Sequence, residues 1–209
     1  KIDLIVISHN HYDHLDKNSV KILGKDSSTV WYVPLGLKKW FDELNIKNVI
    51  ELDWFQERKL DNVEIICLPS QHWSKRSLFK SFDTLWSSWS LKVGNFKFWF
   101  AGDTGYNKIQ FKKIGDEYGP FDLSAIPIGA YEPRWFMKSF HVNPEEAIFI
   151  HEDIKSEKSI GMHFGTFVLT TEPILEPIEK IKSIITNNEN FKGEFMIPES
   201  GVIYSLDKK

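Results

Sequence analysis

Residues 5–16 read IVISHNHYDHLD, and their centre, HNHYDH at residues 9–14, holds three histidines and one aspartate in six positions. The apolar residues just before it, LIVI at 4–7, have the composition of a buried strand. Without a cation, so many imidazole and carboxylate groups at a strand end would repel and desolvate one another. We therefore interpret the stretch as a metal-binding motif.

The spacing within the motif divides its side chains between two cations. Residues two apart in an extended chain point the same way, so His9 and His11 can reach one metal ion. Asp13 and His14 follow once the chain has begun to turn, and they can reach a second ion close by. The remaining ligands must come from distant parts of the chain.

Three further ligand-type side chains follow strand-like runs: His72 after NVEIICLPSQ, Asp103 at the end of FKFWFAGD, and His163 after KSIGM. Together with the motif they give seven candidate ligands for two metals. Imidazole and carboxylate without thiolate suit zinc, and other divalent transition metals are possible. A carboxylate is the natural bridge between two cations about 3.5–4 Å apart, and Asp103 is the candidate for that bridge.

Two histidines lie outside this set. His141 precedes a helix cap in SFHVNPEEA, where it is either an incidental loop residue or an acid or substrate contact at the site. His151 lies in the amphipathic run EEAIFIHED, and we predict that it faces solvent. The single cysteine, Cys67, is predicted to be a small buried hydrophobic residue.

Composition indicates an ordinary globular chain. Its 209 residues suffice for one large domain, 1–209, and 42% are hydrophobic and 26% charged. A net charge of −3 disfavours a nucleic-acid partner. No apolar run approaches the roughly 18 residues that span a bilayer. An aromatic share of 14% suggests an aromatic core or an apolar substrate groove.

Strand-like and helix-like runs alternate along the chain, which predicts a layered α/β or α+β fold with its functional groups at strand ends. The helix beginning at Asn143 has the clearest start signal, because Asn143 can cap and Pro144 fits the first helical position. The predicted strands are 1–8, 28–33, 47–52, 62–68, 84–93, 96–101, 122–128, 158–162, 193–197 and 201–206, and the predicted helices are 17–23, 35–44, 108–119, 143–154 and 173–188.

HNHYDH fits the His-x-His-x-Asp-His signature of the metallo-β-lactamase superfamily. Within it, the segments SHNHYDHLD, PSQHWS, LWSSWS, FWFAGDTGYN, GPFDLSAIPIGAYEPRWFMK, HVNPEEA and MHFGTFVL resemble N-acylphosphatidylethanolamine-hydrolysing phospholipase D and its bacterial relatives. The resemblance runs from about Ile5 to Leu169, and IPIGAYEPRWFM is specific well beyond the metal motif.

The resemblance implies an α+β fold, a four-layer αβ/βα sandwich with a dinuclear site. Carried over residue by residue, it assigns His9, His11 and His72 to one metal and Asp13, His14 and His163 to the other, with Asp103 bridging them. His141 matches a histidine near the phosphodiester. Family members have strands before the motif, whereas only KIDLIVI precedes it here, so we expect a partial sequence that hides any signal peptide or membrane-contacting segment.

The implied activity is zinc-dependent hydrolysis of a phosphodiester, releasing phosphatidic acid and an N-acylethanolamine from N-acylphosphatidylethanolamine. Asp13 can take the proton of the nucleophile, and His141 can donate one to the leaving group. Arg134 either steers a phosphate or forms an ordinary salt bridge. Tyr131 and Trp135, with Trp73 and Phe136, form either a wall for acyl chains or part of the core.

Two other functions fit the same residues. One is a lactonase or another phosphodiesterase of the same fold, because the chemistry of the metal site is shared. The other is a metal-loaded domain that binds a lipid or a partner without turnover. The expected partner is a phospholipid or another anionic small molecule, with a cytoplasmic location or peripheral contact with a membrane. The sequence predicts no oligomeric state.

Overall fold

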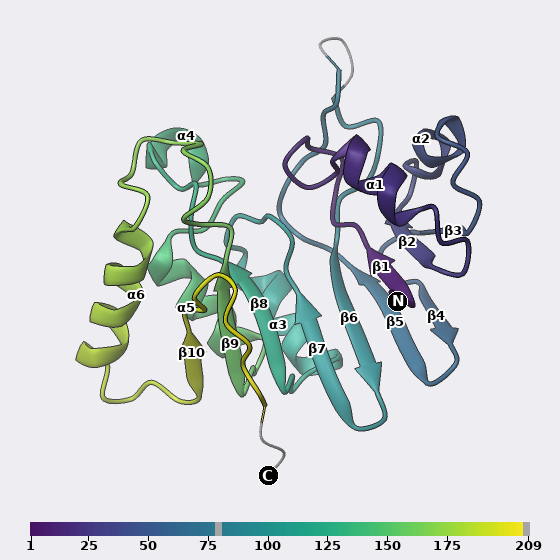
Figure 1. The fold of residues 1–209 in the computed structure, drawn as a ribbon. Coiled ribbons are helices and arrows are strands. Elements are labelled where there is room, and N and C mark those ends of the chain that lie inside the picture. Colours follow the sequence, from purple (N-terminus) through teal and green to yellow (C-terminus); the bar gives the residue numbers. More distant parts are fainter. Residues whose placement is uncertain (78–80, 207–209) are drawn as a thin grey trace.

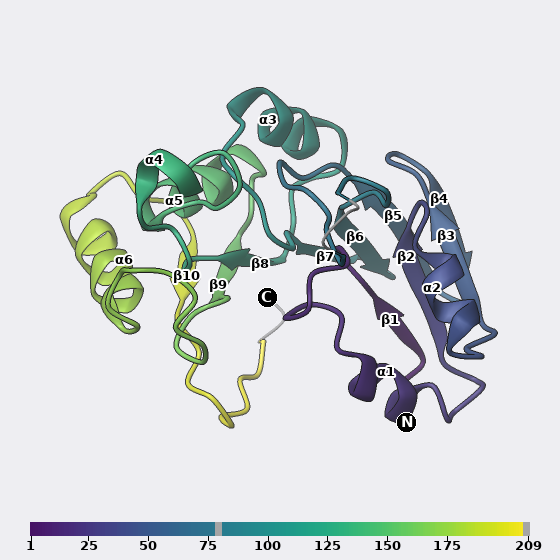
Figure 2. The same ribbon diagram turned by 90° about the horizontal axis from the view of Figure 1, so that it is seen from above.

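A computed structural model describes residues 1–77 and 81–206 of the chain. Two β-sheets of three and seven strands pack face to face, and helices cover the outer face of each (Figures 1 and 2). Three hydrophobic clusters fill the interfaces between these layers, one beneath each set of helices and one between the sheets. The arrangement is the four-layer sandwich expected from the sequence.

The smaller sheet has the order β1-β2-β3 and is parallel throughout. Alternate residues of β2 serve different layers: Trp31 and Val33 pack toward the helices, whereas Val30 and Tyr32 face the larger sheet. Its strands are β1 (Leu4–Val6), β2 (Val30–Pro34) and β3 (Val49–Leu52), and its helices are α1 (Lys17–Leu23) and α2 (Lys38–Glu43).

The larger sheet has the order β10-β9-β8-β7-β6-β5-β4. It is antiparallel from β4 to β7 and parallel from β7 to β10. The strands are β4 (Glu57–Leu60), β5 (Val63–Leu68), β6 (Ser88–Val93), β7 (Phe96–Phe100), β8 (Leu123–Pro127), β9 (Lys158–Met162) and β10 (Glu194–Met196).

The outer face of the larger sheet is covered by α3 (Lys108–Glu117), α5 (Pro144–Asp153) and α6 (Glu176–Asn187). A short helix, α4 (Arg134–Met137), lies near α6 in Figure 1. Between the sheets, Trp89 is fully buried, and its indole N–H donates to the carbonyl oxygen of Ile7 at 2.9 Å. Cys67 is buried in the same layer, as predicted.

The structure corrects several predicted elements. Residues 201–206 form no strand, although their composition favours one, and β4 and α4 were not predicted. The sequence of β4, ERKL, has little intrinsic strand preference, so its conformation depends on pairing with β5 at the sheet edge. The predicted helices at 35–44 and 173–188 are shorter at both ends than predicted.

The topology brings distant residues to one edge. Because β6 is antiparallel to both neighbours, β5 runs in the same direction as β7, and β8 and β9 continue that direction. The segments that follow β5, β7 and β9 therefore emerge at the same edge of the larger sheet.

Within the described residues, no helix is long and apolar enough to cross a membrane.

Candidate metal centre

A first group of three imidazoles lies at this edge: His9 and His11 after β1, and His72 after β5. The Nδ1 atom of His11 lies 2.9 Å from Nε2 of His9 and 3.3 Å from Nε2 of His72. Nitrogens bound at about 2.0–2.1 Å to one tetrahedral zinc would be about 3.3 Å apart. The observed spacing is close to that value.

Outer partners orient two of these rings. The Nδ1–H of His72 donates to the carbonyl oxygen of Phe140 at 2.9 Å, which leaves Nε2 without a proton and directed at the group. Nδ1 of His9 lies 3.0 Å from the hydroxyl oxygen of Ser8. Histidine ligands of metals are usually held in this way, because the outer hydrogen bond fixes the tautomer and the ring orientation.

A second group contains Asp13, His14, Asp103 and His163. The Nε2 atom of His163 lies 3.5 Å from Oδ2 of Asp13 and 3.4 Å from Oδ1 of Asp103. The Nε2 atom of His14 lies 3.0 Å from Oδ2 of Asp103. This group joins the motif after β1 to the segments that follow β7 and β9.

Asp103 lies between the two groups. Its Oδ2 atom is 3.9 Å from Nε2 of His9 and 3.8 Å from Nε2 of His72, besides its contacts with the second group. The residue before it, Gly102, has a φ of 61°, and a Cβ there would lie 2.6 Å from Cβ of Ser8. Only glycine avoids both the strain and the clash, so Gly102 lets Asp103 approach the motif.

Residues around the motif hold its loop in place. Asp16 caps α1 by accepting from the backbone N–H of Ser19 at 2.6 Å. The guanidinium of Arg76 lies 4.5 Å from the ring centre of Tyr12 and donates to the carbonyl oxygen of Asn10 at 3.0 Å. The sequence interpretation did not include Arg76, because nothing in the local pattern QHWSKR links it to residues 66 positions earlier.

Charge balance at the site favours neutral imidazoles and ionised carboxylates. Burial lowers the pKa of His72 to about 3 and keeps the pKa of His9 well below its usual value. Burial alone would raise the pKa of Asp103, but the imidazoles of His163 and His14 outweigh it and hold that pKa well below normal. These are the protonation states that metal ligands require.

His163 is the exception. Burial would lower its pKa, but the carboxylates of Asp103 and Asp13 outweigh burial and raise it to about 9. The proton on His163 therefore supplies positive charge where two carboxylates converge. A bound cation would take over that role and release the proton.

The donor set fits divalent transition metals. Oδ1 of Asp103 is buried and has no hydrogen-bond partner within residues 1–77 and 81–206. Buried polar atoms without partners are rare and call for an explanation such as an ion. Five imidazoles and two carboxylates, with no cysteine among them, match the ligand chemistry of zinc, iron or manganese. The ligand roles of the seven residues stay predictions.

His141 lies at the edge of both groups. One ring nitrogen lies within 4.8 Å of ligand atoms of His72 and Asp103, and its Nδ1 has no hydrogen-bond partner in the described part of the chain. Burial lowers its pKa to about 4, so the ring is neutral near pH 7. The structure thus brings His141 to the site, in line with the sequence, while its chemical role stays a prediction.

The prediction that His151 faces solvent is wrong. Its side chain is 1% exposed and joins three elements, because Nδ1 lies 2.7 Å from the hydroxyl oxygen of Ser159 in β9 and Nε2–H donates to the carbonyl oxygen of Lys192 before β10. The amphipathic pattern of α5 misled the interpretation, since β10 and the residues before it cover the face on which His151 lies.

The three residues predicted to contact substrate differ in environment. Tyr131 is 1% exposed, and its hydroxyl donates to Oε1 of Glu176 at 2.6 Å. Arg134 forms an ion pair with Glu146 at 2.7 Å and donates to the backbone carbonyl of His141 at 2.8 Å. Trp135 is 86% exposed on α4. Arg134 thus has the salt bridge that was its alternative assignment, and a substrate role for any of the three stays a prediction.

The other two aromatic residues considered for the acyl wall also differ from each other. Trp73 packs at 4.9 Å from the ring centre of His11, and Phe136 is exposed beside Trp135 on α4. Neither forms part of the buried clusters that fill the layers. The aromatic content predicted either a core or a groove, and the fold uses aromatic residues in both ways.

A cavity of about 190 Å³ adjoins the second group of ligands. Asp13 and His163 form one side, and Phe164, Thr166, Phe167 and Leu169 form the rest of its lining. The loop that supplies these residues follows β9, and its apolar side chains are largely exposed. A polar end that contains two candidate metal ligands and an apolar wall thus meet in one cavity.

Residues 1–164 match the beta-lactamase superfamily domain. The chain is 45% identical over 220 residues to N-acyl-phosphatidylethanolamine-hydrolyzing phospholipase D 1 of Caenorhabditis elegans, an alignment that covers 100% of this chain and 62% of the relative. It is 39% identical to the mitochondrial phospholipase of that name in Saccharomyces cerevisiae, over 99% of this chain and 45% of the relative. The chain therefore spans less than two thirds of each of these relatives.

Solved structures share the fold at low sequence identity. Igni18, a metallo hydrolase of Ignicoccus hospitalis, superposes with a TM-score of 0.73 at 20% identity, over 99% of this chain and 80% of its own. The diiron β-hydroxylase CmlA of Streptomyces venezuelae superposes with a TM-score of 0.71 at 17% identity, over 94% of this chain and 44% of its own. Fold, ligand groups and domain match agree, and the chain belongs to the metallo-β-lactamase superfamily.

Proposed function

We propose that the chain is the catalytic part of a metal-dependent phosphodiester hydrolase of the phospholipase D type. Its substrate would be N-acylphosphatidylethanolamine, and its products would be phosphatidic acid and an N-acylethanolamine. The observation that carries the proposal is the meeting of two ligand groups at Asp103, beside a cavity with an apolar wall. The names of the relatives with 45% and 39% identity support the substrate class.

Two zinc ions would be held by His9, His11 and His72 on one side and by Asp13, His14 and His163 on the other, with Asp103 between them. When bound, such a pair supplies a water of lowered pKa and withdraws charge from phosphoryl oxygens. Asp13, whose pKa His163 and His14 lower despite partial burial, is ionised and able to accept a proton at its carboxylate.

His141 would serve the leaving group. Its neutral ring can donate one N–H hydrogen bond to an oxygen of the phosphodiester, and its Nδ1 has no hydrogen-bond partner within the described residues. Arg134 would act indirectly, since its guanidinium holds the backbone of His141 against Glu146 at the start of α5. The cavity beyond Asp13 and His163 would receive an acyl chain.

The metal ligands alone do not select the reaction, because this fold hosts several chemistries. A lactonase or another phosphodiesterase would use the same seven residues, and a lipid-binding domain without turnover would use the same cavity. The apolar lining of the cavity favours a substrate with a long acyl chain over a small polar lactone.

The test is an assay of the full-length, zinc-loaded protein against N-acyl phospholipids, ordinary phospholipids and lactones, with metal content measured on the same sample. We expect two metal equivalents and the highest kcat/KM for the N-acyl phospholipids. Faster opening of a lactone than cleavage of any lipid would replace the phospholipase assignment with the lactonase. Metal binding and lipid binding without hydrolysis of any substrate would favour the binding domain.

A further inference from the structure

The wall of the cavity is a loop with little structure of its own. After β9 the chain passes through His163 and Gly165, both with positive φ, and then through Phe167, Val168 and Leu169, which are 66%, 79% and 52% exposed. Apolar side chains so exposed contribute little burial to hold a loop in one place. Something else must fix the position of this segment over the cavity.

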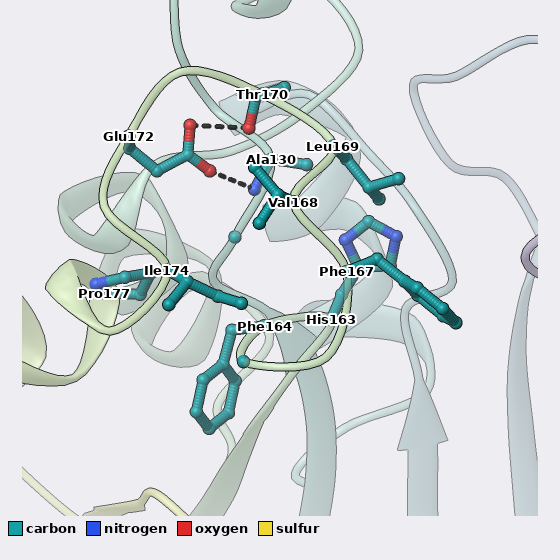
Figure 3. A pocket seen from close by; sticks show the side chains of 12 residues that line it. Ala130, His163, Phe164, Phe167, Val168, Leu169, Thr170, Glu172, Ile174 and Pro177 are labelled. Atoms are coloured by element: carbon teal, nitrogen blue, oxygen red, sulfur yellow. Dashed lines mark hydrogen bonds between the residues drawn. The ribbon is translucent and has the colours of Figure 1, made fainter.

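Glu172 provides that fixation. Its Oε1 accepts from the backbone N–H of Ala130 at 2.7 Å and of Tyr131 at 3.3 Å, and its Oε2 accepts from the N–H of Glu132 at 3.1 Å and the hydroxyl of Thr170 at 2.6 Å. Figure 3 shows the carboxylate directed at Thr170 and Ala130, with His163 and Phe167 on the opposite side of the view.

The N–H groups that bind the Glu172 carboxylate lie together in the turn after β8. Ala130 has a φ of 64°, and the N–H groups of the three residues 130–132 all point to one carboxylate, an arrangement that binds anions. Burial would raise the pKa of Glu172, but the hydrogen bonds from Thr170 and the backbone outweigh it and lower the pKa. The carboxylate is therefore ionised, and hydrogen bonds to it are strong.

The same turn packs against the metal centre. A Cβ on Gly129 would lie 2.3 Å from the carbonyl oxygen of His163, so the two backbones are in direct contact there. The N–H of Ile128 donates to the carbonyl oxygen of Met162 at 3.0 Å. Glu172 thus ties the far end of the loop to the turn that already contacts its near end. Along the chain, Phe167 and Leu169 lie between these two attachments.

We propose that Glu172 is a positioning residue that holds the loop 164–171 over the cavity and thereby sets the selectivity for acyl-chain length. This inference rests on the proposed function, and it extends that function by naming the residue that fixes the acyl wall. Glu172 belongs neither to the candidate ligand groups nor to the lining of the cavity beside Asp13, although it lines a smaller neighbouring pocket that shares His163, Phe167 and Leu169 with that cavity. It acts through the loop.

The test compares Glu172→Gln with Glu179→Gln, which changes an exposed glutamate on α6. The glutamine keeps the size of the side chain but turns one acceptor oxygen into a donor that faces N–H groups. Amide hydrogen exchange of segments 128–132 and 164–172 should accelerate at least roughly tenfold, the factor expected from losing hydrogen bonds to a charged acceptor. Thr170→Val removes one of the four donors, so its exchange should lie between the wild type and Glu172→Gln.

The catalytic measurement uses N-acyl phospholipids of increasing chain length. In Glu172→Gln we expect KM for long chains to rise roughly tenfold while kcat stays within about twofold, and the preference for long chains to shrink. Metal content should match that of the wild type, and Glu179→Gln should behave as the wild type does in every measurement.

Unchanged exchange in both segments would overturn the inference, and so would an equal loss of activity for all chain lengths accompanied by loss of metal. If the wild type cleaves no N-acyl phospholipid, the proposed function fails, whereas accelerated exchange in Glu172→Gln would still support the anchoring of the loop. The two proposals can therefore fail separately.

Discussion

At the scale of single residues, the site depends on one buried carboxylate placed among five imidazoles. Asp103 is 2% exposed, and its Oδ2 contacts both ligand groups at 3.0–3.9 Å. A buried charge of this kind is stable only when positive charge surrounds it. In the metal-free chain the proton on His163 supplies part of that charge. A metal ion bound beside Asp103 would therefore change the protonation of His163.

Asp103→Asn should abolish activity while the protein remains folded. The amide has the shape of the carboxylate but lacks the charge that offsets two neighbouring cations. The loss should exceed the roughly 10–100-fold typical of removing an outer partner of a ligand. Ser8→Ala, which removes the outer partner of His9, is the matched control. Turnover and metal content of the folded variants check the prediction, and wild-type turnover in Asp103→Asn would contradict the bridging role.

His141→Ala should keep metal and fold but lose turnover by roughly 10²–10⁴-fold, the usual effect of a positioned acid or base. The reason is its place at the edge of both groups, with Nδ1 buried and unpaired in the described residues. Steady-state kinetics and metal analysis of the same preparation test this. If zinc is lost instead, His141 is a ligand or supports one. Wild-type kinetics would leave it as a loop histidine before α5.

At the scale of elements, the positions of the site residues depend on the ends of the helices and strands more than on their lengths. Asn143 caps α5 with a full capping box, in which its side chain accepts from the N–H of Glu146 and Glu146 accepts from the N–H of Asn143. The same Glu146 pairs with Arg134 of α4. The cap that the sequence predicted thus also fixes the segment carrying His141, a coupling that appears only when the two helices are placed together.

His151 joins α5, β9 and the residues before β10, and its protonation should weaken the fold. Burial lowers its pKa in the folded state, so the unfolded chain binds more protons as pH falls through the unfolded pKa of about 6.5. Stability is therefore fully present above that pH and is lost below it, by at most about 1.4 kcal/mol per pH unit for this group.

Urea unfolding of wild type and His151→Gln, both with chelator, at pH 8, 6 and 5 measures this effect. The histidines of the metal centre titrate in both proteins, so the difference between the two pH profiles isolates His151. The wild type should lose more stability than the variant between pH 8 and pH 5. Parallel profiles would show that His151 has the same pKa in the folded and unfolded states and contributes nothing to the pH dependence.

The sequence predicted much of the element order but not the elements that depend on their neighbours. Apolar and aromatic runs such as VWYV at 30–33 can be predicted as strands from their own composition, because strands buried on both faces are continuously apolar. The polar strand β4 and the single turn of α4 have no such signal. His151 was misplaced for the same reason, since its burial comes from a segment about 40 residues later.

At the scale of the whole molecule, the candidate metal centre connects the two sheets. The motif at 9–14 follows a strand of the smaller sheet, whereas His72, Asp103 and His163 follow strands of the larger one. The sequence predicted that these seven side chains would come together, because ligand-type residues followed strand-like runs. It could not predict the cavity wall or Glu172, since neither the contact of residues 130–132 with residue 172 nor the exposure of the loop has a local signal.

Removing the metal should therefore destabilise the whole fold and not merely inactivate the site. A ligand that binds only the folded state at 100 times its Kd contributes about 2.7 kcal/mol. Since 1 kcal/mol shifts the Tm of a domain of this size by about 2–4 °C, loss of one such site should lower Tm by roughly 5–11 °C. Without metal, the imidazoles of His9, His11 and His72 also lose the cation that their converging nitrogens face.

Scanning calorimetry of zinc-loaded and chelator-treated protein measures this change, and restoring zinc should restore Tm. Asp103→Asn is the matched variant, because it should shrink the difference between the two states while leaving the layers of the fold intact. A Tm independent of zinc in the wild type, with zinc bound as judged by metal analysis, would mean that zinc binds the unfolded chain as well as the folded one, which would contradict a centre that the fold assembles.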